Sequence, residues 1–378
     1  MSRVLVVTND FPPRPGGIQT FVHELVRRLP TDDVIVYASR WRGWQDFDAA
    51  QPYTVVREDT KVLLPTPAVR RRAVALLRQH ECDSVLFGAA APLGLLGPAL
   101  REAGARRIVA LTHGHEAGWA QLPGPRQLLR RIGDGVDTVT YLGEYTRSRI
   151  AAALSPVAAS RMVRLTPGVD TSVFHQDPAG RDLVRVRHGL AERPVVVCVS
   201  RLMPRKGQDV LIKAWPQVQK QIPGAALLLV GGGPYRKKLN RLVAERELVG
   251  DVLLTGSVPF AELPAHYAAG DVFAMPARTR NRGLDVEGLG IVYLEASATG
   301  LPVIAGDSGG APDAVLPGET GVVVDGRSTG QVQTQLVRLL GDAPGRDALG
   351  SRGRAWVENE WSWDRQVDVV RGLIETPS

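Results

Sequence analysis

The feature that most constrains the fold is an alternation of short apolar runs with longer helical patterns. Seven such runs occur in the first half of the chain and six in the second, among them "RVLVVTN" at 3–9, "PVVVCVS" at 194–200 and "ALLLVGG" at 226–232. Many are continuous rather than alternating, which is typical of parallel strands covered on both faces. Helical patterns such as "IQTFVHELVRRL" at 18–29 lie between them. The chain is therefore predicted to form two doubly wound, Rossmann-like α/β domains.

The length also favours two domains, because 378 residues exceed the usual size of a single core. Pro167 and Gly168 interrupt the pattern within "TPGVDTSVF" at 166–174 and mark the boundary. We expect a first domain over 1–166 and a second over 167–360. The last helical stretch, "WSWDRQVDVVRGLIE", has no strand after it, so 361–378 is expected to cross back to the first domain.

Composition narrows the classes of partner. The net charge of +7 indicates an anionic partner, yet no nucleic-acid-binding signature accompanies it, so nucleic acid is not expected. No apolar run is long enough to span a bilayer, and "MSRVLVVTND" does not have the form of a signal peptide. Two cysteines without metal spacing fit a reduced compartment, and we expect a cytoplasmic protein.

The loop after the first strand is a candidate phosphate site. It reads "TNDFPPRPGGIQTF", and Gly16 and Gly17 precede a helix that opens near Ile18. Paired glycines at a helix start let backbone N–H groups approach a phosphate. A tight turn between strand and helix is the alternative. Neither G-x-G-x-x-G nor the Walker lysine motif occurs, so a dinucleotide or P-loop site is not predicted.

A second candidate follows the strand at 194–200, where "RLMPRKGQD" carries Arg201 and Lys206 into a helix. Arginine offers a planar fork and lysine a point charge, and together they suit a diphosphate. The alternative is a solvated basic loop. In doubly wound sheets ligands bind beyond the carboxyl ends of strands, which favours the functional interpretation.

The third candidate is "DVEGLGIVYLEASATG" at 285–300. We expect a helix from about Gly290, with Glu287 just before it and Glu295 in its second turn. This arrangement offers N–H groups to an anion and carboxylates to hydroxyl groups, as a nucleotide sugar requires. Helix capping is the alternative, but capping requires neither the glycines nor both glutamates.

The segment "EGLGIVYLE" resembles the E-x7-E motif of family 4 retaining glycosyltransferases with the two-domain GT-B fold, whose domains face each other across a cleft. "THGHEAGW", "SRLMPRKGQD" and "PVIAGDSGGAPDAV" add to the similarity, which spans nearly the whole chain. The combination is most similar to PimB′-type phosphatidyl-myo-inositol mannosyltransferases of actinobacteria. "GEY" at 143–145 and the basic "RNRG" at 280–283 depart from the pattern expected for that family.

The resemblance implies a role for each candidate residue. Gly16 and Gly17 would contact the β-phosphate, while Arg201 and Lys206 would neutralise the diphosphate. The donor sugar would be held by Glu287 and the backbone of Gly288, Leu289, Gly290 and Ile291. Glu295 would accept from the ribose hydroxyls, and the backbone near Ser257 and Val258 would line the base. His113 would lie beside the transferred sugar as a catalytic residue, and Asp10 would face the acceptor.

The implied reaction is retaining, front-face transfer of mannose from GDP-mannose to a phosphatidyl-myo-inositol mannoside lipid, without a metal or other cofactor. Another nucleotide sugar or a soluble acceptor is the alternative within the family. A nucleotide-sugar epimerase or hydrolase would share the donor site but would lack an acceptor site. A carbohydrate-binding module would have no need of the phosphate-directed cations.

A lipid acceptor also implies contact with an anionic membrane surface, at the inner face of the cell membrane. "LPTPAVRRRAVALLRQH" at 64–80 reads as an amphipathic helix with Arg70, Arg71 and Arg72 near its start. "LPGPRQLLRRIG" at 122–133 repeats the pattern with exposed leucines expected beside its arginines. Apolar residues beside arginine suit a bilayer interface. The alternative is that both helices cover the sheet and that their arginines are solvated.

Overall fold

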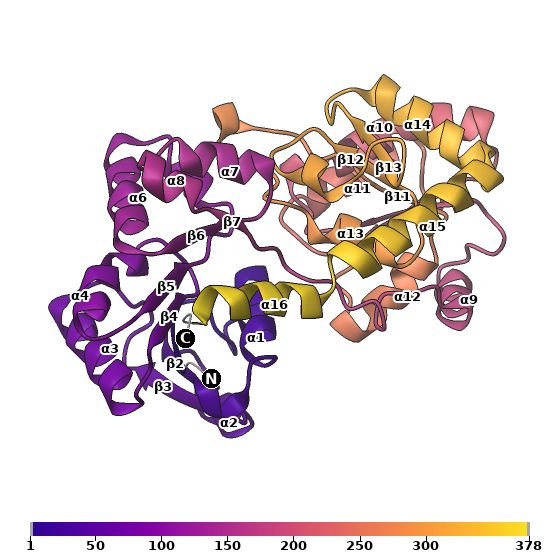
Figure 1. Cartoon of the computed structure of the whole chain (residues 1–378). Helices are drawn as coiled ribbons and strands as arrows, with labels where there is room; N and C mark the ends of the chain where they lie inside the picture. The colour runs from indigo at the N-terminus through magenta and orange to yellow at the C-terminus, as the bar shows by residue number, and fades with distance from the viewer. Residues whose placement is uncertain (1–2, 376–378) are drawn as a thin grey trace. The chain divides into compact units, whose positions relative to one another are not determined.

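The computed structural model describes residues 3–375 and divides the chain into two compact units. Unit 1 comprises the chain up to Gly168 together with the C-terminal segment from Trp363, and unit 2 comprises Val169–Ser362. Each unit contains one parallel sheet with helices packed around it (Figure 1).

The sheet of unit 1 has seven strands in the order β3-β2-β1-β4-β5-β6-β7. The strands are β1 Val4–Thr8, β2 Val34–Ser39, β3 Thr54–Glu58, β4 Ser84–Phe87, β5 Arg107–Ala110, β6 Thr138–Tyr141 and β7 Val163–Arg164. The helices are α1 Gly17–Val26, α2 Trp44–Ala49, α3 Pro67–Gln79, α4 Gly97–Glu102, α5 Glu116–Trp119, α6 Pro123–Gly135, α7 Glu144–Ala151, α8 Pro156–Ser160 and α16 Trp363–Ile374.

Both faces of this sheet are buried, since successive side chains of a strand point to opposite sides. In β1, Leu5 and Val7 belong to one core cluster, and Val4 and Val6 belong to the other. A strand that is apolar at every position therefore has a buried environment for each side chain. This burial explains why the apolar runs of the sequence are continuous.

The C-terminal helix α16 packs on unit 1, as the sequence predicted. Val367, Val370 and Ile374 of α16 share a core cluster with Phe21 and Leu25 of α1. Figure 1 shows the yellow α16 beside the indigo α1. Apolar residues spaced three and four apart give α16 one buried face, so the chain end is held by core packing.

The sheet of unit 2 has six strands in the order β10-β9-β8-β11-β12-β13. The strands are β8 Val195–Val199, β9 Ala226–Val230, β10 Val252–Gly256, β11 Val272–Met275, β12 Val303–Gly306 and β13 Gly321–Val324. The helices are α9 Pro178–Arg187, α10 Gln208–Gln221, α11 Arg236–Glu245, α12 Leu263–Ala268, α13 Ile291–Ala298, α14 Thr329–Gly341 and α15 Ala343–Glu360. Every pairing between named strands in the two sheets is parallel. The predicted fold class is therefore confirmed.

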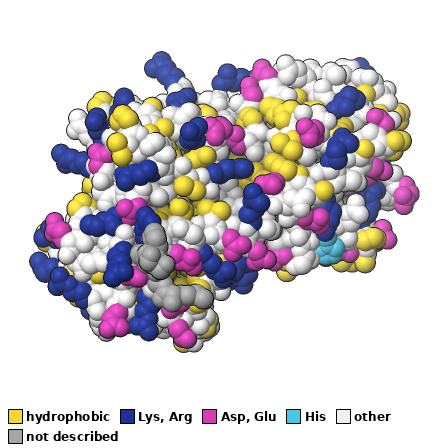
Figure 2. Space-filling model, viewed as in Figure 1, with side chains coloured by type: hydrophobic (Ala, Val, Ile, Leu, Met, Phe, Trp, Pro, Cys, Tyr) yellow, Lys and Arg dark blue, Asp and Glu magenta, His cyan; other side chains and the backbone are white. Residues whose placement is uncertain are grey.

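The surface carries both signs of charge. Figure 2 shows Lys and Arg side chains interspersed with acidic ones over the visible face, with apolar areas between them. Within residues 3–375, no helix has the length and apolar character needed to cross a membrane. Cys82 and Cys198 are both buried free thiols.

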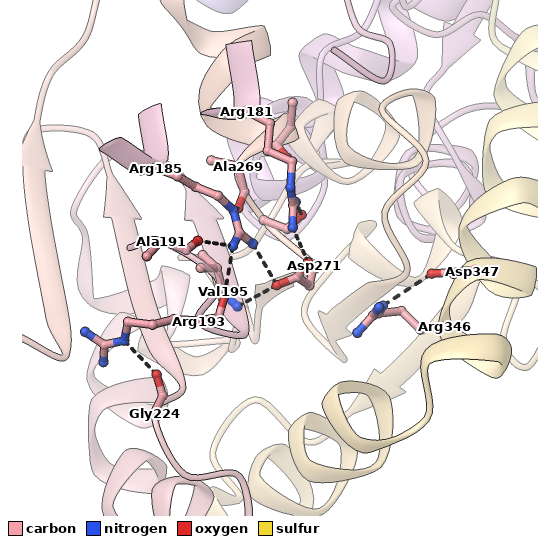
Figure 3. A network of polar contacts seen from close by, with 12 residues as sticks. Arg181, Arg185, Ala191, Arg193, Val195, Gly224, Ala269, Asp271, Arg346 and Asp347 are labelled. Carbon is pink, nitrogen blue, oxygen red and sulfur yellow. Dashed lines mark hydrogen bonds and ion pairs between the residues drawn. The ribbon is translucent and has the colours of Figure 1, made fainter. Parts of the chain in front are cut away.

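A network of hydrogen bonds centred on Asp271 links the amino ends of β8 and β11 in unit 2 (Figure 3). The Asp271 carboxylate accepts from Arg181 Nη2 at 2.7 Å and from Arg185 Nη2 at 3.0 Å. It also accepts from the backbone N–H of Val195 at 2.7 Å. Arg185 is buried, and that burial lowers the pKa of its guanidinium. The network ties α9 to the beginnings of β8 and β11.

Replacing Asp271 with Ala should destabilise the protein, because the buried Arg185 guanidinium would lose its counter-charge. Removing one partner of a buried ion pair costs about 3 kcal/mol or more in unfolding free energy. Chemical denaturation measures this loss. Asp347→Ala is the matched control, since Asp347 pairs with Arg346 at 3.4 Å and its side chain is 73% exposed. That control should cost less than about 1 kcal/mol; equal losses would contradict a fastening role for Asp271.

Candidate functional site

The loops that follow β8 and β11 leave neighbouring strands at the same edge of the unit 2 sheet. β11 pairs with β8 in parallel, although β9 and β10 come between them in chain order. Because crossovers between parallel strands are right-handed, these two connections run to opposite faces of the sheet. Doubly wound proteins bind ligands at such a switch point. The predicted site residues Lys206 and Glu287 lie on these two loops.

Lys206 and Glu287 form an ion pair between the two loops. Lys206 ends the 3-10 turn after β8, and its Nζ lies 2.6 Å from Glu287 Oε2. The two residues are only 9% and 7% exposed, respectively. Gly207 follows with a φ of 78°, and a Cβ at this position would overlap the carbonyl of Pro276. Glycine at 207 therefore allows the close approach of the two loops on which the pair depends.

Two arginines follow β8 near this ion pair, and they differ in whether the guanidinium has an acidic partner. Arg205 Nη1 lies 3.3 Å from Asp285 Oδ1, and its Nε lies 3.9 Å from Glu287 Oε2. Arg201 is exposed, and among residues 3–375 only its backbone is hydrogen-bonded, through an oxygen that accepts from Gln208 Nε2 at 3.2 Å. The site thus combines a paired lysine with an arginine whose guanidinium is available to an anion.

The backbone from Gly288 to Ile291 leads from Glu287 into α13. The helix begins at Ile291, after Gly290 with a φ of 82°, close to the start that the sequence predicted. Within the described part of the chain, the N–H groups of Leu289, Gly290 and Ile291 have no acceptor. Unpaired N–H groups at a helix N-terminus favour an anion.

A further loop, which sequence analysis missed, supports this backbone. Ser308 Oγ accepts from the N–H of Glu287 at 3.3 Å, and the N–H of Gly310 donates to the Glu287 carbonyl at 2.9 Å. A Cβ at Gly309 or Gly310 would overlap the carbonyls of Glu287 and Gly288. The signal in the sequence is the glycine pair directly after a strand, within "DSGG" at 307–310.

Glu295 lies in the second turn of α13, and its carboxylate is held by a tyrosine that the sequence did not suggest. Glu295 Oε2 accepts from the Tyr267 hydroxyl at 2.6 Å. Burial raises the pKa of Glu295 to about 7, while the hydrogen bond from Tyr267 lowers it. The carboxyl group therefore changes charge near neutral pH.

A pocket of about 520 Å³ opens beside Arg201, between the loops that follow β8, β9 and β10. Ser257 and Val258, predicted to line the base, are among its lining residues. Gly231, Gly232 and Gly233 also line it, and sequence analysis did not identify them. A Cβ at Gly232 would overlap Ser257 Oγ, so the pocket depends on a glycine there. Three glycines directly after a strand were the available signal.

The remaining predicted residues lie in unit 1. Gly17 is the first residue of α1, and Gly16 precedes it with a φ of 153°. Gln19, which sequence analysis missed, donates through Nε2 to Asp10 Oδ1 at 2.6 Å. A Cβ at Gly16 would overlap the Gln19 amide oxygen. Gln19 therefore connects the glycine loop to Asp10, and it is itself buried.

His113 follows β5 and is fixed by three contacts. Its Nε2 lies 2.6 Å from the Gly88 carbonyl, its backbone N–H donates to Glu116 Oε2 at 3.0 Å, and its ring meets Phe21 edge-on at 5.5 Å. A carbonyl can only accept, so Nε2 carries the proton. Burial lowers the pKa of His113, which keeps the ring neutral. Its Nε2 therefore acts as a donor and not as a base.

The basic loop at 280–283 forms a short turn and pairs with an acidic side chain. Arg280 Nη1 lies 3.5 Å from Asp285 Oδ2. Asn281 and Arg282 have φ values of 49° and 55°, within a 3-10 turn over Asn281–Gly283. The Asp285 carboxylate thus forms ion pairs with both Arg280 and Arg205.

Comparison with known proteins agrees with this geometry. The family model described as "Glycosyltransferase Family 4" matches residues 15–173, and "Glycosyl transferases group 1" matches residues 181–356. The chain is 52% identical, over 98% of its own length and 99% of the relative, to the GDP-mannose-dependent alpha-(1-6)-phosphatidylinositol monomannoside mannosyltransferase of Mycobacterium tuberculosis. The identity is 53% to the protein of the same description from Mycolicibacterium smegmatis, with 95% of each chain covered.

Solved structures with the same fold include Anabaena HepE in complex with UDP, with a TM-score of 0.81, 20% identity and 98% of each chain covered. The sucrose-phosphate synthase of Thermosynechococcus elongatus gives a TM-score of 0.76, also with 20% identity and 98% of each chain covered. The two parallel sheets are thus those of a glycosyltransferase of the two-domain GT-B class. More narrowly, the chain belongs to the family of GDP-mannose-dependent phosphatidylinositol monomannoside mannosyltransferases.

Replacing Lys206 with Ala should weaken nucleoside-diphosphate binding and lower turnover by about 100-fold or more. The change removes a cation and leaves the Glu287 carboxylate beside the incoming anion with only the more distant Arg205, whose Nε lies at 3.9 Å. Titration calorimetry and initial rates measure the two effects. Lys213→Ala is the matched control, because Lys213 is a half-exposed lysine of α10 that pairs with Asp209 at 3.5 Å. Equal effects of the two substitutions would show that general basic charge, and not the ion pair, matters.

Proposed function

We propose that this protein transfers mannose from GDP-mannose to a phosphatidylinositol mannoside lipid, with retention of the α configuration. The observation that carries the proposal is the 52% identity over 98% of the chain to the mannosyltransferase of Mycobacterium tuberculosis. The geometry of unit 2 supports it, because a nucleotide sugar combines the two chemistries for which these loops are equipped, a diphosphate and several hydroxyl groups.

In this proposal the diphosphate lies against Arg201, Lys206 and the N–H groups at the start of α13. The guanidinium of Arg201 and the N–H groups have no other partner among residues 3–375, so they can bind the anion without breaking an existing contact. Lys206 is shared between the diphosphate and Glu287. These charges and dipoles stabilise the negative charge that builds on GDP as it leaves.

The donor sugar is held by Glu287 and the backbone from Gly288 to Ile291. An ionised carboxylate only accepts hydrogen bonds, so Glu287 suits the hydroxyl groups of mannose. Its ion pair with Lys206 fixes the carboxylate in position. The base lies in the pocket lined by Ser257 and Val258.

Transfer proceeds on the front face of the sugar. The bond from mannose C1 to the β-phosphate oxygen breaks while a bond from C1 to the acceptor hydroxyl oxygen forms on the same side. The hydroxyl proton passes to the departing β-phosphate oxygen, so the leaving group serves as the base. His113 orients the reacting groups in this proposal: its Nε2–H donates to the Gly88 carbonyl, which fixes the neutral ring and leaves Nδ1 as an acceptor.

Unit 1 supplies the acceptor side in this proposal. Asp10 would accept from the acceptor, and its position is set by the amide of Gln19. Gly16 and Gly17 would bring backbone N–H groups to the β-phosphate. The protein needs no metal in this mechanism, because Arg201 and Lys206 provide the positive charge.

The reaction can be tested directly. With GDP-mannose and phosphatidylinositol monomannoside, we expect one product that carries an additional mannose, with the α configuration at the new linkage by NMR. GDP should bind more tightly than UDP by titration calorimetry. Release of free mannose in the absence of acceptor would identify a hydrolase, and an altered sugar on GDP would identify an epimerase. Transfer to a water-soluble acceptor alone would contradict the lipid assignment.

We further propose that unit 1 contacts an anionic membrane at the inner face of the cell membrane. The expectation that the leucines of 122–133 are exposed is wrong in part. Of the leucines in 122–133, Leu122 is exposed, but Leu129 is buried against the core. Leu76 and Leu77 of α3 are buried as well. The apolar faces of both helices are used in packing, because a helix that covers a sheet must bury one side.

The membrane contact is therefore assigned to the segment just before α3 together with the first turns of α3. Val62 and Leu64 are 49% and 52% exposed, and Arg70, Arg71 and Arg72 are exposed on the first turns of α3. Exposed apolar side chains next to clustered arginines suit the interface of an anionic bilayer. A lipid acceptor makes such contact useful, since its acyl chains stay in the membrane.

Replacing Arg70, Arg71 and Arg72 with Ser should reduce co-sedimentation with anionic liposomes, because each arginine near such a surface contributes about 1 kcal/mol. The loss should be largest at low salt, and affinity for GDP should not change. A matched control removes three exposed cations of unit 2, Lys220, Lys237 and Arg246. Equal losses in both variants would show that net charge and not this segment governs binding. Binding that survives molar salt would exclude the electrostatic explanation.

A further inference from the structure

The Tyr267 hydroxyl occupies one side of the Glu295 carboxylate. Tyr267 belongs to α12, is fully buried and donates to Glu295 Oε2 at 2.6 Å. No hydrogen bond to Glu295 Oε1 is formed within residues 3–375. An ionised carboxylate offers about four acceptor positions, so both positions on Oε1 and one on Oε2 remain for a ligand.

The ring of Tyr267 is held in place by other aromatic side chains. Phe174 packs edge-on against it, with ring centroids 5.7 Å apart and an interplanar angle of 84°. Phe273 of β11 packs on it at 5.8 Å and 31°. The hydroxyl oxygen therefore has a fixed location, and the hydrogen bond selects one orientation of the Glu295 carboxylate.

We infer that Tyr267 is a positioning residue that orients Glu295 so that its free oxygen positions face the two adjacent hydroxyl groups of the donor's ribose. This inference rests on the proposed function, because it assumes a nucleotide donor. It assigns to the Tyr267 hydroxyl a role that the buried ring alone does not have. Position 267 carries a tyrosine where phenylalanine would fill the same volume, and a purely apolar core position does not require the hydroxyl group.

The protonation state of the Glu295 carboxyl group can be followed by varying the pH, because its pKa lies near neutral. Burial raises the pKa of Glu295 to about 7, and among residues 3–375 the only group that opposes this effect is the Tyr267 hydroxyl, whose hydrogen bond lowers the pKa. Burial, followed by the nearby Glu295 charge, raises the pKa of Tyr267, so the phenol stays protonated and remains the donor. Hydroxyl groups of ribose prefer the ionised carboxylate, which accepts only.

The elements packed against α13 bring few other ionisable groups to this carboxyl. α13 packs on α15, β11, β12 and the turn Ala311–Ala314. β11 and β12 carry no ionisable side chain, and the turn carries Asp313. From α15, Arg354 donates to the Ala298 carbonyl at the far end of α13.

Three further groups lie near the pair. Cys198 of β8 faces both Tyr267 and Tyr293, and burial raises its pKa to about 12, so it stays a neutral thiol. Glu287 faces Tyr293 and is paired with Lys206. The change of charge near pH 7 therefore belongs to Glu295.

The binding-competent carboxylate forms as the pH rises through about 7, so ribose-dependent affinity should increase over that range. Removal of the Tyr267 hydroxyl takes away the hydrogen bond that favours the charged form. In a Tyr267→Phe variant the increase should therefore occur at higher pH.

The experiment compares GDP with 2′,3′-dideoxy-GDP by titration calorimetry from about pH 5.5 to about pH 9. The ratio of the two affinities isolates the ribose hydroxyls, because titration of the phosphates affects both ligands alike. Tyr293→Phe is the matched control. Tyr293 is also fully buried and also loses a hydroxyl, but that hydroxyl donates to the Met275 carbonyl at 2.7 Å and not to Glu295.

In the wild type, GDP should bind about tenfold more tightly than the dideoxy compound above pH 7, and the ratio should fall in acid. Tyr267→Phe should lower this ratio severalfold at pH 7 and move its rise to higher pH. Tyr293→Phe should leave both the ratio and its pH dependence unchanged. Glu295→Gln should remove the pH dependence altogether, which gives a second test if the Tyr267 variant does not fold.

Each failure has a distinct meaning. A wild type that binds neither compound would contradict the proposed function. A wild type that binds both equally would show that Glu295 does not recognise ribose. A Tyr267→Phe variant with the wild-type ratio and pH dependence would overturn the role inferred for Tyr267, while the proposed function would stand.

Discussion

Parallel pairing of β8 with β11 is the constraint on which the candidate site depends. The pairing places the ends of two strands side by side although two strands intervene between them in the chain. The Lys206 and Glu287 side chains consequently meet at 2.6 Å across 81 positions of sequence separation. A buried lysine or glutamate alone would be costly to ionise, so each depends on the other.

Close backbone approach is the second requirement of the site, and glycines meet it. Gly207 lies against the Pro276 carbonyl, Gly309 against the Glu287 carbonyl and Gly232 against the Ser257 hydroxyl. At each of these positions a Cβ would occupy space that another loop already fills. The loops at the strand ends therefore pack as one layer, and the polar groups that face a ligand are held by backbone contacts more than by side-chain packing.

The amino and carboxyl ends of the unit 2 strands have different roles. At the amino ends of β8 and β11, the Asp271 carboxylate binds Arg181, Arg185 and the backbone N–H of Val195, all of which belong to the fold itself (Figure 3). At the carboxyl ends, the guanidinium of Arg201 and the first N–H groups of α13 have no partner among residues 3–375. A satisfied network stabilises the sheet at one edge, so unsatisfied donors can be tolerated at the other, where a ligand completes them.

The sequence by itself determined the two doubly wound sheets and the return of α16, because continuous apolar runs and helical spacing depend on local pattern alone. It also pointed to Lys206, Glu287 and Glu295, since charged residues directly after predicted strands or at a predicted helix start are visible without coordinates. It could not identify Tyr267, Gln19 or Ser308, and it was wrong about Leu129. Tyr267 meets Glu295 from 28 positions away, and Ser308 meets Glu287 from 21 positions away. Only the tertiary structure decided which side of each helix is buried and which distant hydroxyl reaches a carboxylate, because burial and hydrogen-bond geometry arise when the elements pack.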